Sequence, residues 1–82
     1  MTIKRLLIAN RGEIASRIIS SAHDMGISCV AIYTEADKDT PYVREADQAF
    51  KLSDSYLNSK EILDIALKSN SDAIHPGYGF LS

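Results

Sequence analysis

The sequence has 82 residues, of which 45% are hydrophobic and 24% charged, and its formal net charge is -2. A chain of this length has room for one domain with one modest core, and it buries only about 60% of its unfolded surface on folding. The scattered Lys and Arg residues argue against a nucleic-acid or membrane-surface partner, because such proteins concentrate basic residues on one face. The apolar run near the start, residues 6–9, is too short for a signal peptide or a membrane span, so we expect a cytoplasmic protein.

The first predicted elements are a strand and a helix. Residues 3–9 (IKRLLIA) predict a β-strand, and Asn10 is the expected N-cap of the helix that follows, with Glu13 in its first turn. Gly26 is the expected helix stop, because glycine readily adopts the left-handed conformation that closes a helix. The apolar positions of this helix recur at helical spacing and predict a wide buried stripe. This stripe comprises Ile14, Ala15, Ile18, Ile19, Ala22 and Met25.

A second strand is predicted at residues 28–34 (SCVAIYT), whose nearly continuous apolar run suits a strand buried on both faces. Cys29, the only cysteine, is expected to be a buried reduced thiol. A polar loop follows, in which Pro41 can begin a single helical turn. Residues 48–52 (QAFKL) then predict a short third strand.

The second amphipathic helix, residues 59–70, is expected to be capped by Asn58 or Ser59. Its predicted buried side comprises Ile62, Leu63, Ile65, Ala66 and Leu67. A last short strand at residues 72–75 leads into a glycine loop. Strands that alternate with helices predict an α/β fold, a Rossmann-like doubly wound parallel sheet of about four strands with helices on both faces.

Ligands of such sheets bind in a crevice beyond the carboxyl ends of the strands. We therefore expect two loops to meet there, the loop after the first strand and the segment HPGYGFLS of residues 75–82. The first of these loops comprises Asn10, Arg11, Gly12 and Glu13. His75 ends a strand at this crevice, where it either fixes the loop by hydrogen bonding or acts as a general acid or base.

The loop after the first strand also resembles a dinucleotide-binding turn. Its spacing is N-x-G-x-x-A against the expected G-x-G-x-x-G, and Glu35 lies about 20 residues on, where a ribose-binding carboxylate is expected. Asn10 and Arg11 would crowd the approach of a pyrophosphate. A free-standing dinucleotide-binding module therefore stays open as an alternative function, and a non-enzymatic scaffold domain is another.

The remaining candidate residues have simple interpretations. No phosphate-binding lysine motif, paired metal-ligand spacing or nucleophile elbow occurs, so no metal site is predicted. His23 is expected to be a solvated helix histidine. Arg17 lies off the apolar stripe, where it is either solvated or part of an interface. The other aromatic residues are expected in or near the core, and these are Tyr33, Tyr42, Phe50 and Tyr56.

Two segments at consistent separation, LIANRGEIASRI and HPGYGFLS, closely resemble the N-terminal (pre-ATP-grasp) domain of biotin carboxylase. This family includes the biotin carboxylase parts of acetyl-CoA, propionyl-CoA, methylcrotonyl-CoA and pyruvate carboxylases. The resemblance extends over essentially the whole chain, residues 1–82, and includes AIYTEADKDTPYVREAD and SYLN. We therefore expect one such domain, incomplete at its C-terminal end.

The resemblance implies an ATP-dependent ligase of the ATP-grasp class. Such an enzyme uses ATP with Mg or Mn and bicarbonate to make carboxyphosphate, and then carboxylates N1 of biotin on a carrier protein. In the family these ligands are held mainly by other domains, so the chain alone is expected to be inactive. The implied partners are the ATP-grasp and C-terminal domains, the biotin carboxyl carrier protein and a carboxyltransferase. The residues implied to lie near biotin are Tyr78, Gly79 and His75.

The sequence departs from the family pattern in two places. Only KLSD precedes SYLN, where family members usually have a longer glycine- and proline-containing connection. Bacterial family dimers use charged residues along the first helix; Arg17 matches that pattern, but Ser20 replaces a frequent arginine and Asp24 a glutamate. A homodimer interface at these three residues is therefore a weaker expectation. The acceptor of the carboxyl group is chosen by a carboxyltransferase that this sequence does not represent.

Overall fold

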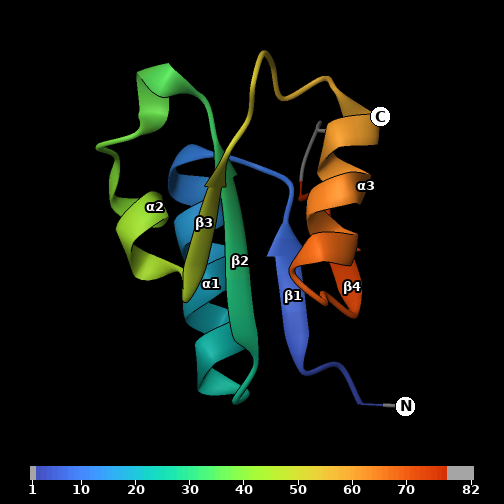
Figure 1. Ribbon diagram of the computed structural model, residues 1–82. Helices are drawn as coiled ribbons and strands as arrows, with labels where there is room; N and C mark the ends of the chain where they lie inside the picture. Colours follow the sequence, from blue (N-terminus) through green and yellow to red (C-terminus); the bar gives the residue numbers. More distant parts are fainter. Residues whose placement is uncertain (1, 78–82) are drawn as a thin grey trace.

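The computed structural model describes residues 2–77 of the chain. Its strands form one sheet with the order β3-β2-β1-β4, in which every neighbouring pair is parallel (Figure 1). The strands are β1 (Arg5–Ile8), β2 (Ser28–Tyr33), β3 (Gln48–Lys51) and β4 (Ala73–His75). The prediction of an α/β fold with a parallel sheet of about four strands is confirmed.

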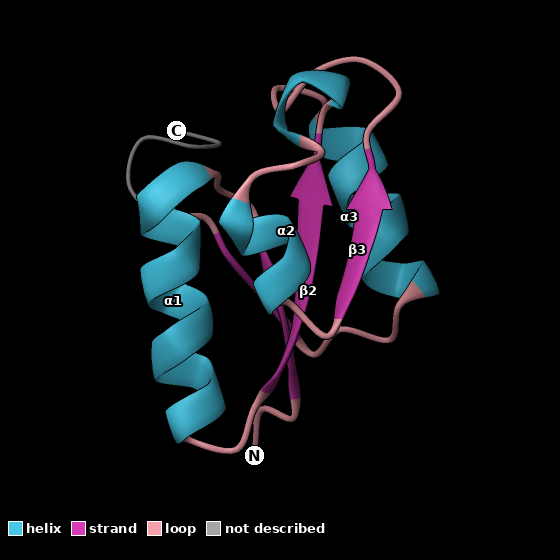
Figure 2. Ribbon diagram, turned by 90° about the vertical axis from the view of Figure 1, so that its left-hand side faces the viewer, coloured by secondary structure: helices cyan, strands magenta, loops and turns pink. Residues whose placement is uncertain are grey.

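Helices cover both faces of this sheet, as predicted for a doubly wound fold. Figure 2 shows α1 and α2 on one side of the strands and α3 on the other. The helices are α1 (Gly12–Asp24), a short 3-10 turn η1 (Glu35–Asp37), α2 (Pro41–Glu45) and α3 (Ser59–Lys68). None of the helices within residues 2–77 is long and apolar enough to cross a membrane.

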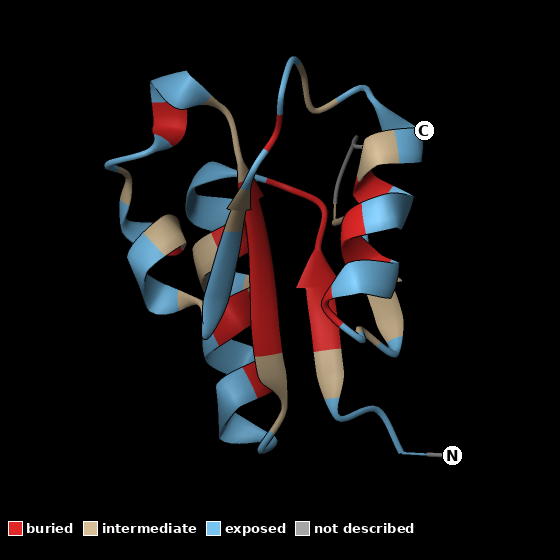
Figure 3. Ribbon diagram, in the orientation of Figure 1, coloured by how far each residue is buried: buried red, intermediate tan, exposed pale blue. Residues whose placement is uncertain are grey.

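The core has two layers because successive side chains of β1 and β2 point to opposite faces of the sheet. Both central strands are buried along most of their length (Figure 3). The layer beneath α1 and α2 contains Leu6, Ile8, Ala15, Ile19, Ala22, Cys29, Ala31 and Tyr42. The layer beneath α3 contains Leu7, Ala9, Val30, Ile32, Leu52, Ile62, Ile65 and Ala66. The expected core or near-core positions of the other aromatic residues are also confirmed, because Tyr33, Phe50 and Tyr56 pack against these layers.

The buried stripe of each helix is narrower than the apolar pattern predicted. On α1, Ile14 is 40% exposed, and Met25, just beyond the helix end, is 74% exposed. On α3, Leu63 and Leu67 are 54% and 78% exposed. The reason is geometric, since a helix lying on a sheet contacts it along one narrow line. Apolar residues at the margins of the stripe therefore stay in solvent in this chain.

Pro41 begins α2 as predicted, and two of the three boundaries predicted for α1 and α3 are confirmed. Gly26 has φ +75 after the end of α1, and the Asn58 side chain accepts a hydrogen bond from the Glu61 backbone N–H at 3.1 Å. The prediction that Asn10 caps α1 is wrong. Arg11 is the N-cap residue and makes no side-chain capping bond, while the Asn10 amide donates to the carbonyl of Pro76. Tertiary pairing of two loops takes precedence over local capping at this position.

The difference between central and marginal apolar residues of α3 can be measured. Ile62→Ala should lower the free energy of unfolding by about 2–5 kcal/mol, because the side chain is fully packed and leaves a cavity. Leu67→Ala, five positions further along the same helix, should change it by less than about 0.5 kcal/mol, since substitutions of exposed side chains usually have small effects. Urea unfolding of the two variants beside the unchanged chain gives both values. Equal losses would contradict this division of the helix surface.

Candidate functional site

The two predicted crevice loops meet at the carboxyl ends of β1 and β4. The Ala9 backbone N–H donates to the His75 carbonyl at 2.9 Å, and the Asn10 side-chain amide donates to the Pro76 carbonyl at 2.8 Å. The Asn10 carbonyl oxygen accepts the Arg11 backbone N–H at 2.8 Å. Asn10, which is only 3% exposed, therefore joins the loop after β1 to the loop after β4.

The loop after β4 has a constrained geometry at Gly77. This residue has φ +66, and a Cβ there would lie 2.5 Å from the Asn10 side-chain nitrogen. The Gly77 N–H donates to Nδ1 of His75 at 3.0 Å. This contact favours the interpretation of His75 as a residue that fixes the loop. Tyr78 and Gly79, the other two residues implied to lie near biotin, are outside the described residues.

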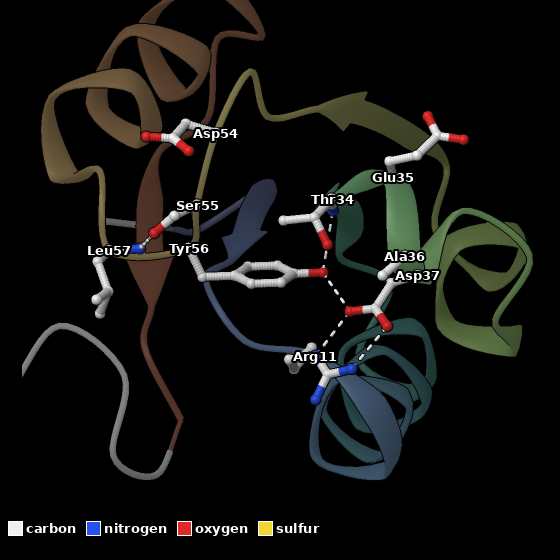
Figure 4. Close-up of a pocket in the computed structure, with 9 residues that line it drawn as sticks. All are labelled: Arg11, Thr34, Glu35, Ala36, Asp37, Asp54, Ser55, Tyr56 and Leu57. Atoms are coloured by element: carbon white, nitrogen blue, oxygen red, sulfur yellow. Dashed lines mark hydrogen bonds and ion pairs between the residues drawn. The ribbon is translucent and has the colours of Figure 1, made fainter.

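A buried carboxylate, Asp37, organises the same edge of the sheet. Asp37 is 4% exposed, and both of its oxygens accept hydrogen bonds from the Arg11 guanidinium, through Nε and Nη2, each at 2.6 Å. The Tyr56 hydroxyl donates to Oδ2 at 2.5 Å. Arg11 holds the pKa of Asp37 below its usual range, and the Tyr56 hydrogen bond acts in the same direction. Figure 4 shows the Arg11 and Tyr56 side chains converging on this carboxylate.

The network continues beneath Asp37 into the core. The Tyr56 hydroxyl accepts the Thr34 backbone N–H at 3.1 Å and lies 2.8 Å from the Tyr42 hydroxyl. Tyr42 donates to the Ile32 carbonyl at 2.8 Å, inside the sheet. Burial raises the pKa of Tyr42 and keeps it neutral. Sequence reasoning missed Asp37 as a site residue, because an aspartate in a polar loop carries no signal of its burial.

A hollow of about 600 Å³ lies beside this network and includes Glu35 and Arg11 in its lining (Figure 4). Glu35 accepts from Lys38 Nζ at 2.7 Å and from Lys51 Nζ at 2.5 Å, and the two lysines lower its pKa to about 2. Glu35 thus pairs with two cations, and Arg11 is turned toward Asp37. In this arrangement Glu35 is paired with lysines rather than open to a ribose, and Arg11 is paired with Asp37, which argues against a dinucleotide-binding module.

The three residues expected at a dimer interface share one side of α1. Arg17, Ser20 and Asp24 are all exposed, and their spacing along the helix places them on the same face. The Nε atom of Arg17 lies 4.0 Å from Oε1 of Glu13, which is one helical turn earlier. The helix therefore presents a polar surface directed away from its buried stripe.

A further cluster lies at the opposite edge of the sheet, near the start of β2. His23 is not simply solvated as expected, because its Nε2 lies 2.9 Å from Oδ2 of Asp47. The Asp47 carboxylate also accepts the Cys29 backbone N–H at 2.7 Å. Cys29 is a buried free thiol, as predicted. Burial, and to a lesser degree Asp47, raises the pKa of that thiol to about 11.

Removing the Asp37 charge should destabilise the chain. Asp37→Asn is expected to cost about 1–3 kcal/mol, because buried hydrogen-bond partners lose their charged acceptor. Glu35→Gln is the matched control, since Glu35 is exposed, and it should change stability little. Urea unfolding at neutral pH compares the two.

Comparing the unchanged chain with Asp37→Asn also predicts how the free energy of unfolding depends on pH. A carboxylate with a lowered folded-state pKa stabilises the fold above its unfolded pKa of about 3.9. This contribution disappears as the pH falls through the lower pKa of the folded state. The stability difference between the unchanged chain and Asp37→Asn should therefore shrink below about pH 4. A difference that is constant with pH would show that the charge is not the cause.

The close packing at Gly77 predicts an unequal effect of two glycine substitutions. Gly12→Ala should cost about 1–2 kcal/mol, because Gly12 has φ +64 but open space around its missing Cβ. Gly77→Ala should cost more, since its Cβ also displaces the Asn10 amide. Thermal unfolding of both variants measures the difference, and an equal cost would mean that the loop contact is unimportant.

Comparison with known proteins gives a consistent answer. The family model "Biotin carboxylase, N-terminal domain" matches residues 2–82. Biotin carboxylase 1 of Bacillus subtilis (strain 168) is 55% identical over 85 residues, covering 98% of this chain and 19% of that protein. The alpha3 subunit of the biotin-dependent acyl-coenzyme A carboxylase of Mycobacterium leprae (strain TN) is 52% identical over 85 residues, covering 98% of this chain and 14% of that subunit.

A solved structure agrees with these relatives. The biotin carboxylase domain dimer of 2-oxoglutarate carboxylase from Hydrogenobacter thermophilus, in complex with MgADP, ADP and bicarbonate, has a TM-score of 0.94 and 45% identity. The match covers 99% of this chain and 19% of that domain chain. This chain therefore spans about a fifth or less of the relatives that it matches. The similarity extends from end to end of the chain, and the chain belongs to the biotin carboxylase N-terminal domain family.

Proposed function

We propose that this chain serves as the N-terminal part of an ATP-dependent biotin carboxylase. In the proposed reaction, bicarbonate attacks the γ-phosphate of ATP to give carboxyphosphate and ADP. The carboxyl group then passes to N1 of a biotin held on a carrier protein, and phosphate is released. The observation that carries this proposal is the family match along residues 2–82, together with identities of 52–55% to curated carboxylase relatives.

The described residues contribute loop geometry to this reaction. Asn10 ties the Pro76 carbonyl to the end of β1, and Gly77 turns the chain directly afterwards. The next residues in sequence are Tyr78 and Gly79, which we propose lie near the biotin ring with His75 supporting the loop. Hydrogen bonds that hold the base of a binding loop favour a defined site, because less positional freedom is lost on binding.

ATP, a divalent metal and bicarbonate are proposed to bind mainly to other parts of the enzyme. Within residues 2–77 the Arg11 guanidinium is engaged by Asp37 and is not free to hold a phosphate. The residues that could group around a metal in this part of the chain lie at the opposite edge of the sheet. The described residues therefore do not fit a MgATP site, and we derive no step through the nucleotide from them.

The proposed partners follow from the same reaction. They are the ATP-grasp and C-terminal domains, a biotin carboxyl carrier protein and a carboxyltransferase that passes the carboxyl group to the acceptor. A homodimer is supported by the dimer of the H. thermophilus relative. We propose that the exposed face of α1 with Arg17, Ser20 and Asp24 contributes to that contact. Relatives named for acyl-coenzyme A and for 2-oxoglutarate leave the acceptor open.

The test measures bicarbonate-dependent ATP hydrolysis and its stimulation by free biotin. The polypeptide made from the complete coding sequence should show both, and residues 1–82 expressed alone should show neither. In the complete polypeptide, Tyr78→Ala should raise the KM for biotin by about tenfold, the loss expected for one aromatic contact. Tyr78→Phe keeps the ring and should change the KM little.

Two results would contradict the proposal. Bicarbonate-dependent hydrolysis by residues 1–82 alone would refute the division of labour between this chain and the other domains. A biotin KM that is the same in the Tyr78→Ala and Tyr78→Phe variants would refute the role given to the loop after β4.

A further inference from the structure

The cluster at the start of β2 brings together three side chains from different segments of the fold that differ in ligand chemistry. One atom from each of His23, Cys29 and Asp47 can serve as a metal ligand, and these atoms all lie within 4.8 Å of one another. They supply an imidazole nitrogen, a thiol sulfur and a carboxylate oxygen. The cluster lies at the amino ends of the strands, and the proposed biotin crevice lies at the carboxyl ends.

Backbone geometry holds the three residues in place. Gly26 at φ +75 reverses the chain directly after α1, which sets His23, in the last turn, over the start of β2. Asp47 is fixed against Cys29 by two hydrogen bonds. Its N–H donates to the Cys29 carbonyl at 2.9 Å, and its carboxylate accepts the Cys29 N–H at 2.7 Å. Two of the three ligands are therefore positioned by the sheet itself.

The His23 ring completes the arrangement from the helix side. Its Nε2 is 2.9 Å from Oδ2 of Asp47, so the imidazole already points into the cluster. His23 and Asp47 have side chains 40% and 49% exposed, while Cys29 is fully buried. A cation can therefore approach from solvent on the side of His23 and Asp47, with the sulfur at the inner end.

The distances suit a small tetrahedral ion. Zinc binds nitrogen and oxygen at about 2.0–2.2 Å and sulfur at about 2.3 Å, so its ligand atoms stand about 3.3–3.8 Å apart. The present ligand atoms lie within 4.8 Å of one another, and His23 Nε2 is 2.9 Å from Asp47 Oδ2, so small adjustments of the three side chains are needed to bring them to the zinc spacing. Three protein ligands leave the fourth position to water.

We propose that His23, Cys29 and Asp47 form a binding site for a single Zn²⁺ ion or a similar borderline divalent cation. A nitrogen, sulfur and oxygen donor set selects Zn²⁺ over Mg²⁺ or Ca²⁺, which prefer oxygen ligands. On binding, the Cys29 thiol releases its proton to solvent and coordinates as the thiolate. The ion joins the end of α1, the start of β2 and the segment before β3, and it stabilises the folded domain because the unfolded chain offers no preformed site.

The experiment uses the polypeptide made from the complete coding sequence, stripped of metal and titrated with Zn²⁺ against a chromophoric chelator. The unchanged protein should bind one equivalent that is absent from Cys29→Ser. His23→Gln and Asp47→Asn should each lower the Zn²⁺ affinity of this site by at least about tenfold, since even the loss of a hydrogen-bond partner of a metal ligand lowers affinity by that much. Asp64→Asn is the matched control, because it removes an exposed carboxylate on α3, across the sheet, and should leave the affinity unchanged.

Two readouts keep the test decisive if Cys29→Ser folds poorly. Co²⁺ in place of Zn²⁺ should give a near-ultraviolet thiolate charge-transfer band in the unchanged protein. Zn²⁺ should also raise the unfolding temperature of the unchanged protein but not that of His23→Gln, which alters a partly exposed side chain and keeps the core intact. The absence of the thiolate band, or equal Zn²⁺ affinity in the unchanged protein and His23→Gln, would overturn the proposal. Neither result depends on biotin carboxylase activity, so failure here leaves the proposed function untouched.

Discussion

The carboxyl edge of the sheet depends on one buried charge, the carboxylate of Asp37. An ionised carboxylate shielded from water is costly unless charged and polar donors surround it. Asp37 meets this requirement through a bidentate contact with Arg11 and a hydrogen bond from Tyr56. These partners come from the segment after β1 and the segment before α3. The single carboxylate thus joins three connections that would otherwise be independent loops.

This constraint reaches the proposed biotin loop through a short chain of contacts. The Arg11 side chain is held by Asp37, and the Arg11 backbone N–H donates to the side chain of Asn10. Asn10 in turn donates to the Pro76 carbonyl. The loop after β4 therefore rests on a scaffold built from the loop after β1. The turn resembles a dinucleotide motif in sequence, but its Arg11 side chain is bound to Asp37.

An aspartate links neighbouring segments by hydrogen bonds at the carboxyl ends of the strands and another does so at the amino ends. At the carboxyl edge Asp37 joins connections through an arginine and a tyrosine, and at the amino edge Asp47 joins His23 and the Cys29 backbone. The chemistry around each differs. Asp37 is buried and saturated with donors, which suits a structural role, whereas Asp47 is half exposed and lies beside a thiol and an imidazole. Only the second arrangement can exchange its hydrogen bonds for a cation.

Local patterns in the sequence determined the element order, the parallel α/β class, the glycine after α1 and the Asn58 cap, because each depends on residues close in the chain. Two distinctive segments were also sufficient to indicate the family. Tertiary structure decided how wide the buried side of each helix is, so that Ile62 is packed as predicted and Leu67 is exposed. It also placed the Asn10 side chain in a hydrogen bond between two loops, where the sequence predicted a helix cap. It brought Asp37 into contact with Arg11 and Tyr56, and it placed His23 beside Cys29 and Asp47. These outcomes depend on contacts between separate elements of the fold, which a local sequence pattern does not report.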